Sequence, residues 1–101
     1  MKKPIKVDEL PGFDAAQYFD SEESIAAYLT DILDANDAGL LAEALGDIAR
    51  ARGMTEIAKS AGISREALYK ALRSDSAPRF DTLNRVCNAL GVRLVARPVH
   101  S

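Results

Sequence analysis

Apolar residues recur at helical spacing through most of the chain, in five separate stretches. The first begins after Asp20 as N-cap, with Glu23 three residues on completing a capping box, and extends to Asn36. Its apolar face comprises Ile25, Tyr28, Leu29, Ile32 and Leu33. This pattern predicts an amphipathic helix over residues 21–36.

A second helix is predicted from Ala38 to Arg52, after the short break marked by Asp37 and Gly39. Its apolar positions are Leu41, Ala44, Leu45, Ile48 and Ala49. Gly53 follows directly, and a glycine at this position ends a helix in a left-handed conformation. Residues 38–52 are therefore expected to form one uninterrupted helix.

Three further helices complete the pattern, over Thr55–Ser60, Ser64–Arg73 and Thr82–Leu90. The polar loop SDSAPRF separates the last two. Asp81 is expected to be the N-cap of the final helix, and Gly91 to end it. The chain is thus predicted to be mainly α, with five helices.

The two ends of the chain have a different pattern. Pro4, Pro11 and Gly12 interrupt any helix, so residues 1–20 are predicted to be an extended lead-in, with a brief strand-like alternation at Ile5 and Val7. Aromatic residues in this lead-in are expected to pack on the first helix: Phe13, Tyr18 and Phe19. The predicted organisation is a lead-in of residues 1–20, one domain of residues 21–97 and a tail of residues 98–101.

Residues 92–97 alternate between apolar and polar side chains, which predicts a short C-terminal β-strand closed by Pro98. A lone strand cannot satisfy its own backbone N–H and C=O groups. It would therefore pair with the segment around Ile5, with a second subunit, or with a partner protein.

The segment Met54 to Arg73, MTEIAKSAGISREALYKALR, has the pattern of a helix-turn-helix. Ala58 is the small residue that faces the second helix, and Gly62 lies four residues later, where the turn needs a positive φ. Ser64 is placed to N-cap the second helix. The internal face comprises Ile57, Ala61, Ile63, Leu68 and Ala71. The alternative is an ordinary helical hairpin.

The second helix of this motif presents polar side chains suited to DNA. Arg65 can pair bidentately with guanine, Glu66 can accept from cytosine N4, and Ser64 can contact bases or phosphate. Thr55 and the loop residue Arg79 are suited to phosphates. Three further residues, one or two turns along the helix, suit base edges or the phosphate backbone: Tyr69, Lys70 and Arg73. The alternative reading is a solvated basic face with no partner.

Charge is divided unevenly along the chain, although the formal net charge is only −2. Residues 1–49 contain 3 Lys and Arg against 11 Asp and Glu, whereas residues 50–101 contain 10 against 4. A basic half that coincides with a helix-turn-helix pattern favours nucleic-acid binding. The acidic half includes the predicted first helix, where carboxylates form either a solvated face or a surface for a basic protein: Glu22, Glu23, Asp31 and Asp34.

Composition argues against an enzyme. The chain of 101 residues suits one small domain, and its single cysteine and single histidine, Cys87 and His100, form neither a nucleophile pair nor a metal site. Cys87 falls in the helical pattern of the last helix and is interpreted as a core residue. We expect no catalytic residues, cofactor or metal, and, because no apolar run could span a bilayer, a cytoplasmic protein.

From Phe13 to Leu94 the chain resembles a known family. Residues 54–92, which include GMTEIAKSAGISREALYKALR and PRFDTLNRVCNALGVRL, resemble the Cro-type helix-turn-helix of lambda-like phage repressors, and more closely the HigA-like addiction-module antidote proteins. The segments FDAAQYFDSEESIAAYLTDIL and LAEALGDIARARG are similar to the N-terminal part of that antidote family. The PRFDT continuation, Pro78 to Thr82, is specific to this subgroup.

This resemblance implies an antitoxin of a type II toxin–antitoxin module. Such a protein neutralises a toxin of the RelE/ParE superfamily by direct binding and represses its own operon as a homodimer on double-stranded operator DNA. The resemblance also implies that the positions carried over from the motif read DNA: Thr55, Ser64, Arg65, Glu66, Tyr69, Lys70 and Arg73. The alternatives are a stand-alone repressor without a toxin, and a protein-interaction module that has lost DNA binding.

Overall fold

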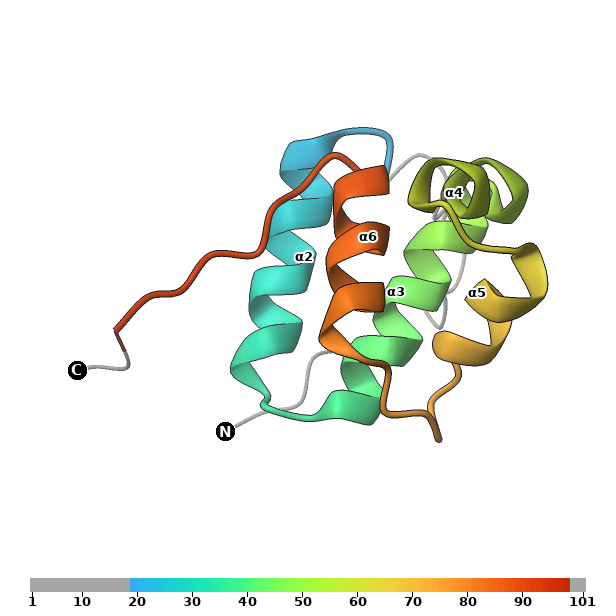
Figure 1. Ribbon diagram of the computed structural model, residues 1–101. Coiled ribbons are helices and arrows are strands. Elements are labelled where there is room, and N and C mark those ends of the chain that lie inside the picture. Colours follow the sequence, from blue (N-terminus) through green and yellow to red (C-terminus); the bar gives the residue numbers. More distant parts are fainter. Residues whose placement is uncertain (1–18, 99–101) are drawn as a thin grey trace, which may run out of the picture.

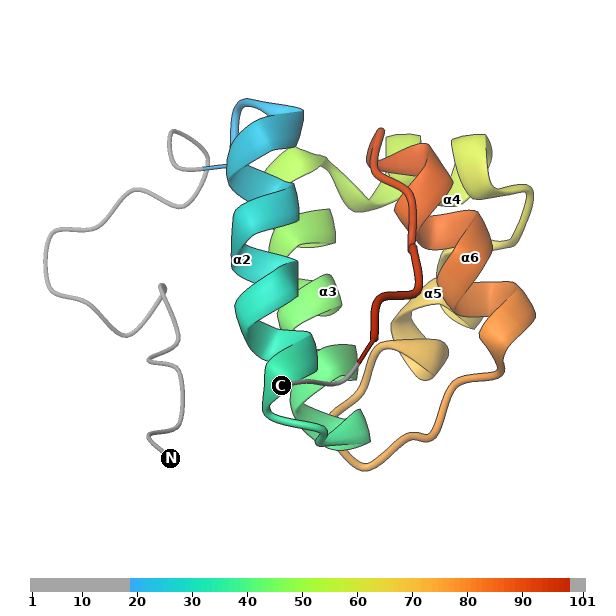
Figure 2. The ribbon, with the colours of Figure 1, turned by 90° about the vertical axis from the view of Figure 1, so that its left-hand side faces the viewer.

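The computed structural model describes residues 19–98, and these fold into five helices. They are α2 (Glu22–Asp34), α3 (Ala38–Arg52), α4 (Met54–Ala61), α5 (Arg65–Ala71) and α6 (Phe80–Ala89). Helices α2 and α3 lie side by side, and α4 contacts α3, α5 and α6 (Figures 1 and 2). The prediction of a mainly α fold with five helices is confirmed for this part of the chain.

Helix α2 begins one residue later than predicted. Ser21, not Asp20, is the N-cap: its hydroxyl accepts a hydrogen bond from the backbone N–H of Ser24 at 3.2 Å. The Ser24 hydroxyl in turn donates to the Ser21 carbonyl at 2.9 Å. The prediction of an Asp20–Glu23 capping box was therefore wrong by one position, because two serines satisfy the first turn. The helix ends at Asp34, and Asn36 then adopts a positive φ of 55°.

Helix α3 has the predicted bounds and lies in the centre of the molecule. The Asp37 carboxylate caps its first turn by accepting from the Leu40 N–H at 3.1 Å. Seven of its residues are buried, and among them Leu45, Ile48 and Ala49 are fully buried. Gly53 has φ 108° and serves both as the C-cap of α3 and as the N-cap of α4. A single glycine thus redirects the chain between the two helices.

The hydrophobic core draws on every helix of the described region. Phe19 is fully buried ahead of α2, and its ring packs on Tyr28 with the ring centroids 5.3 Å apart. The expectation that Phe19 packs on the first helix is confirmed, whereas Phe13 and Tyr18 lie outside the described residues. Leu33 was predicted on the buried face of α2 but is 45% exposed, because it lies at the edge of that face.

Cys87 is buried on the inner face of α6, as expected of a core residue. Burial favours the neutral thiol and raises its pKa to about 11. The thiol therefore remains protonated at neutral pH, which is the state least suited to nucleophilic chemistry.

The start of α6 differs from the prediction. Asp81 is not the N-cap but lies inside the first turn, where its carboxylate accepts from Arg85 Nε at 3.0 Å. Because this i,i+4 ion pair engages the Asp81 side chain, the helix begins at Phe80 and Arg79 occupies the cap position without a side-chain hydrogen bond. Arg85 also donates to the Ala61 carbonyl at 3.4 Å and so links α6 to the end of α4.

The predicted C-terminal β-strand is absent from the described residues. Residues 92–98 are extended but pair with no other segment of that region, and they leave α6 to run past α2 (Figure 1). Val92 and Leu94 are half-buried against the core, whereas Arg93 and Val95 are exposed. The alternation of apolar and polar residues therefore indicated an extended backbone correctly. The alternate side chains pack along a helix, so no partner strand is needed to explain the alternation.

Some sequence predictions cannot be compared with the structure. The Ile5–Val7 strand and the remainder of the lead-in up to residue 18 lie outside the described residues, as does His100. Between residues 19 and 98, no helix is long and apolar enough to cross a membrane.

Candidate nucleic-acid interface

Helices α4 and α5 are joined by a tight turn with the geometry predicted for it. Gly62 has φ 75° and ψ 30°, a left-handed conformation. Its N–H donates to the Lys59 carbonyl at 3.2 Å, and the Ile63 N–H donates to the Ala58 carbonyl at 3.1 Å, which together form a Schellman motif. Ala58 is buried, as expected for the small residue at this crossing. The predictions for Ala58 and Gly62 are both confirmed.

Helix α5 is short and depends on tertiary contacts for its stability. The Ser64 hydroxyl caps it by accepting from the Ala67 N–H at 3.0 Å, as predicted. Leu68 is the one residue of α5 that is fully buried, and the following Leu72 is buried at its C-cap. The helix covers Arg65–Ala71 rather than the predicted Ser64–Arg73, since Leu72 already departs from helical geometry. Two leucines one turn apart therefore hold α5 on the core.

All the residues predicted to contact DNA are solvent-exposed. They are Thr55, Ser64, Arg65, Glu66, Tyr69, Lys70, Arg73 and Arg79. Five of them lie on α5 or directly after it in the chain, Ser64 caps it, and Thr55 lies in the first turn of α4. Arg79 lies apart from these residues, at the N-cap of α6. The structure thus brings most of the predicted set together around α5.

Arg65 and Tyr69 interact directly with each other. Arg65 Nη2 donates to the Tyr69 hydroxyl at 3.2 Å, and the guanidinium carbon lies 5.4 Å from the centre of the tyrosine ring. This i,i+4 contact combines a hydrogen bond with a cation–π interaction. It restricts the Arg65 side chain while leaving most of its five N–H donors for a ligand.

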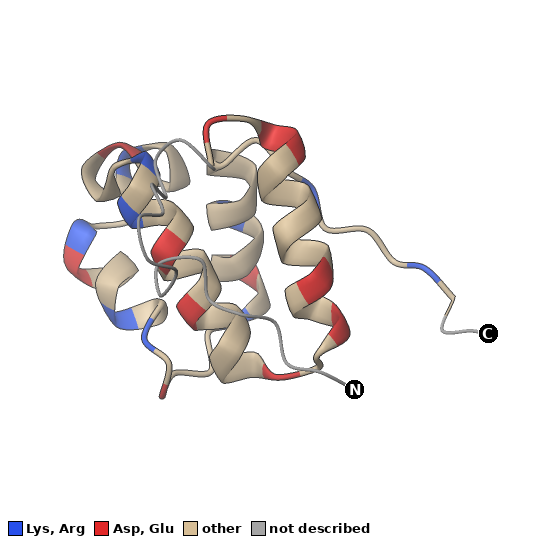
Figure 3. Ribbon diagram, turned by 180° about the vertical axis from the view of Figure 1, so that it is seen from behind, with Lys and Arg blue, Asp and Glu red and all other residues tan. Residues whose placement is uncertain are grey.

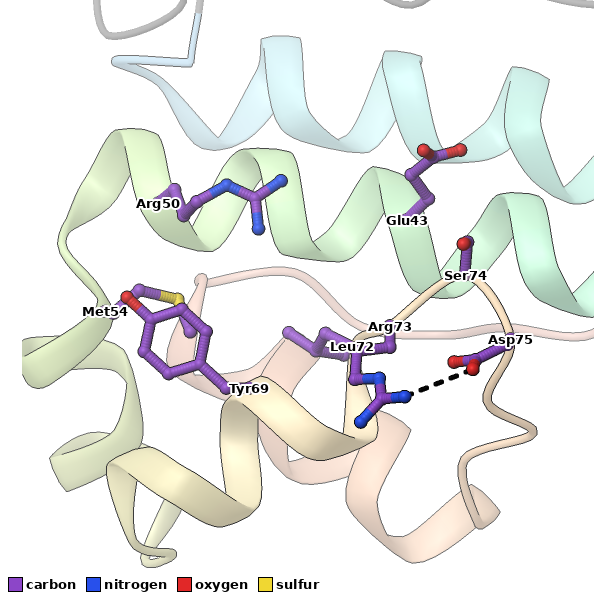
Figure 4. A pocket seen from close by; sticks show the side chains of 8 residues that line it. All are labelled: Glu43, Arg50, Met54, Tyr69, Leu72, Arg73, Ser74 and Asp75. Atoms are coloured by element: carbon purple, nitrogen blue, oxygen red, sulfur yellow. Dashed lines mark hydrogen bonds and ion pairs between the residues drawn. The ribbon is translucent and has the colours of Figure 1, made fainter.

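A groove of about 420 Å³ lies between α3 and α5. Arg50 and Glu43 line it from α3, Tyr69 and Leu72 from the α5 side, and Met54 from the start of α4 (Figure 4). The 72–75 segment closes the end of the groove that lies away from Met54. There Arg73 Nη2 lies 3.2 Å from Asp75 Oδ2, and both side chains are well exposed. The exposed row of α5 therefore forms one wall of a groove whose other wall is α3.

Arg50 was not among the predicted site residues, although it lies opposite Tyr69 in this groove (Figure 4). Its guanidinium Nη2 is 2.6 Å from Asp47 Oδ1, and the Asp47 side chain is almost completely buried while that of Arg50 is half-exposed. A signal was present in the sequence, since an acidic and a basic residue at i,i+3 spacing precede the motif. It was missed because nothing in the pattern shows that Asp47 is buried.

Two glycines of α3 allow the end of α5 to approach closely. A Cβ built on Gly46 would lie 3.1 Å from the Leu72 carbonyl oxygen and 3.3 Å from Arg50 Nη1. A Cβ on Gly39 would lie only 2.6 Å from the Ser74 carbonyl oxygen. The absence of a side chain at Gly46 therefore permits close packing of α3 against the segment that follows α5. Because these two glycines have no side chain, the 72–75 segment, with Arg73 in it, can pack directly against α3.

Helix α2 differs from the other helices in its charge (Figure 3). It carries acidic side chains and neither lysine nor arginine: Glu22, Glu23, Asp31 and Asp34. Helices α3 to α6 carry both signs of charge, and their basic side chains include several on α5 and the adjoining ends of α3 and α4: Arg50, Arg52, Lys59, Arg65, Lys70 and Arg73. The acidic part of the sequence is therefore represented in space mainly by α2. No group of three or more potential metal ligands occurs within residues 19–98.

The fold and this surface define a small helical protein with an exposed basic helix and an acidic helix on another side. Comparison with known proteins identifies its family: residues 9–98 match the family described as "Probable addiction module antidote protein". The chain belongs to this family, and an antidote of an addiction module has a toxin as its partner. The predicted resemblance to addiction-module antidotes is confirmed at this level.

One similar protein comes from Haemophilus influenzae and is named only as an uncharacterized protein. It is 49% identical over 86 residues, which cover 85% of this chain and 89% of that protein. No solved structure matches the chain. The match extends over most of the length of both proteins.

Proposed function

We propose that this protein is the antitoxin of a type II toxin–antitoxin module, a HigA-like antidote that binds and neutralises a RelE/ParE-like toxin in the cytoplasm. In this proposal it also represses its own operon by sequence-specific binding of double-stranded DNA, and it has no enzymatic activity. Family membership supports the antidote role. The observation that carries the DNA-binding role is the solvent exposure of the predicted contact residues around α5.

DNA recognition in this proposal follows the geometry of a Cro-type helix-turn-helix. Helix α5 enters the major groove, with Arg65 and Glu66 near its N-terminus on base edges. Tyr69 orients Arg65 through the contact described above, so less side-chain entropy is lost when Arg65 binds a base. Thr55, Lys70 and Arg73 bind the phosphate backbone on either side.

A homodimer forms part of the proposal, for a physical reason. A single module with one seven-residue recognition helix makes too few contacts for operator affinity, whereas two such helices one turn of DNA apart double them. The extended segment 92–98 and helix α6 are the proposed dimer surface. Val95 in this segment is 71% exposed, so it offers an apolar side chain to a second copy.

Replacing Arg65 by alanine tests the base-reading assignment. The variant is expected to bind its operator more weakly by about 1–3 kcal/mol and to lose discrimination at one base pair, because a bidentate arginine–guanine contact is removed. Gel-shift titration on operator and scrambled duplexes measures both effects. Lys59→Ala is the matched control, since Lys59 is also basic and exposed but is not among the assigned DNA contacts. Equal binding of wild type and Arg65→Ala to both duplexes would contradict the assignment.

Charge reversal on α2 tests the toxin-binding half of the proposal. The double variant Asp31→Lys/Asp34→Lys is expected to slow association with the toxin by about tenfold or more, because an acidic surface steers a basic partner toward it. The partner for the assay is the small protein encoded in the adjacent reading frame, and surface plasmon resonance measures the rate. Glu56→Lys/Glu66→Lys makes the same charge change on α4 and α5 and should leave the rate unaltered. Equal association rates for both double variants would show that α2 is not part of the toxin-binding surface.

A further inference from the structure

We propose that Arg50, on α3 and outside the predicted helix-turn-helix, is a DNA-backbone contact whose guanidinium binds one phosphate at the Tyr69 end of the α3–α5 groove. This inference rests on the proposed DNA-binding function and adds to it a residue from a second helix. Four observations carry it: the position of Arg50, its anchoring, its remaining hydrogen-bonding capacity and the distribution of charge along the groove.

The position of Arg50 continues the exposed row of α5. Arg65 and Tyr69 are four residues apart and lie along one side of α5, and Arg73 follows just after the end of the helix. That side borders the groove, since Tyr69 and Arg73 both line it. Arg50 lines the same groove from the opposite wall (Figure 4). A phosphate seated beside the Tyr69 hydroxyl would therefore be approached by cationic groups from two helices.

The anchoring of Arg50 is stronger than that of an ordinary surface arginine. Its ion pair with Asp47 is short, at 2.6 Å, and the carboxylate is buried. The guanidinium also lies close to Gly46, where the absence of a side chain leaves room for it. Such a side chain is pre-organised, so binding a ligand immobilises it at little further entropic cost. Asp47 thus acts as a positioning residue, and Arg50 as the contact.

Arg50 retains hydrogen-bonding capacity. A guanidinium has five N–H donors in a planar fork that suits phosphate oxygens. Asp47 is its sole hydrogen-bond partner within residues 19–98, through Nη2. Half of the side chain is exposed to solvent. The remaining N–H groups can therefore be offered to an anion in the groove.

Charge along the groove places the anion at one end. Glu43 and Asp75 lie toward the end formed by the 72–75 segment, where Arg73 is already paired with Asp75 and the lining residues carry a net negative charge (Figure 4). Arg50, Met54 and Tyr69 form the other end, which has a cation and a hydroxyl and no acidic side chain among the lining residues. This end also lies next to the start of α4, where Thr55 is a proposed phosphate contact.

The test compares salt dependence of DNA binding for four variants, measured by fluorescence anisotropy on operator and scrambled duplexes. Arg50→Gln removes the charge, and Asp47→Asn/Arg50→Gln removes it together with the buried carboxylate that contacts it. Asp47→Asn keeps Arg50 and reports any structural effect of the ion pair. Arg52→Gln is the matched control, because Arg52 lies on the same helix but donates to the Phe19 carbonyl at 3.1 Å.

Loss of one phosphate contact should reduce the slope of log K against log salt by about 0.9 and weaken binding about fivefold at 0.15 M salt. We expect this of both Arg50 variants, equally on both duplexes, with wild-type slopes for Asp47→Asn and Arg52→Gln. A wild-type slope in the double variant would overturn the assignment of Arg50 alone. Absence of binding by the wild-type protein to either duplex would overturn the DNA-binding proposal with it. Weaker toxin binding with unchanged DNA binding would assign Arg50 to the other partner and overturn the inference.

Discussion

Phe19→Ala is expected to lower the free energy of unfolding by about 3–5 kcal/mol. The Phe19 side chain is fully buried, and its ring packs against Tyr28 on α2. Its replacement removes apolar contacts and leaves a cavity between α2 and α3 that neighbouring helices can fill only in part. Arg52 holds the backbone at this point by donating to the Phe19 carbonyl, so the site cannot readily collapse. Urea denaturation followed by circular dichroism measures the change.

Phe80 provides a matched control for this substitution. Its side chain is 68% exposed at the start of α6, so Phe80→Ala removes the same atoms without opening a cavity. We expect that variant to change the free energy of unfolding by less than about 0.5 kcal/mol. A loss of similar size in both variants would show that Phe19 is not part of the core.

Leu68→Ala is expected to cost about 2–5 kcal/mol of stability, and to have its largest effect on α5. Leu68 is the residue of α5 that is fully buried, and a helix of seven residues is not stable without tertiary contacts. Because α5 carries the proposed base-reading residues, this variant should also lose operator affinity under conditions in which the other helices remain folded. Native-state hydrogen exchange reports protection helix by helix.

Leu33→Ala is the control for Leu68→Ala, since Leu33 is also on a helix but 45% exposed. Its effect on unfolding is expected to be small, and amide protection in α5 should stay at the wild-type level. If Leu68→Ala lowered protection uniformly across all the helices, α5 would be part of one cooperative unit with α3. The idea that α5 is separately anchored would then fail.

The helices were predictable because local signals define them. The 3.6-residue period gave α2 and α3 closely, and the turn at Gly62 and the cap at Ser64 were found from residue types that have few alternatives at such positions. Errors occurred where two capping residues compete. Asp20 and Ser21 are both good N-caps, and only the hydrogen bond from the Ser24 N–H shows that Ser21 is used.

Other features could not be read from the sequence because they depend on tertiary contacts. The alternation of residues 92–97 is the same whether a segment pairs in a sheet or lies along a helix. The predicted strand was therefore wrong, although alternate residues of the segment do pack against the core. Aspartate is a residue type that often serves as an N-cap, yet Asp81 lies inside the helix, where it forms an ion pair with Arg85. The Arg50 site was missed for a similar reason, since burial of Asp47 results from packing between helices.

The close approach of α3 to the 72–75 segment limits how this protein can change during evolution. At Gly39 and Gly46 even a methyl group would meet the backbone of the facing segment, so the angle between these elements cannot be adjusted by small substitutions there. Under the proposed DNA-binding function, variation in operator choice between relatives should therefore be concentrated in the exposed side chains of α5, on a backbone that stays the same. A new specificity would be reached by exchanging side chains and not by re-docking the helix that carries them.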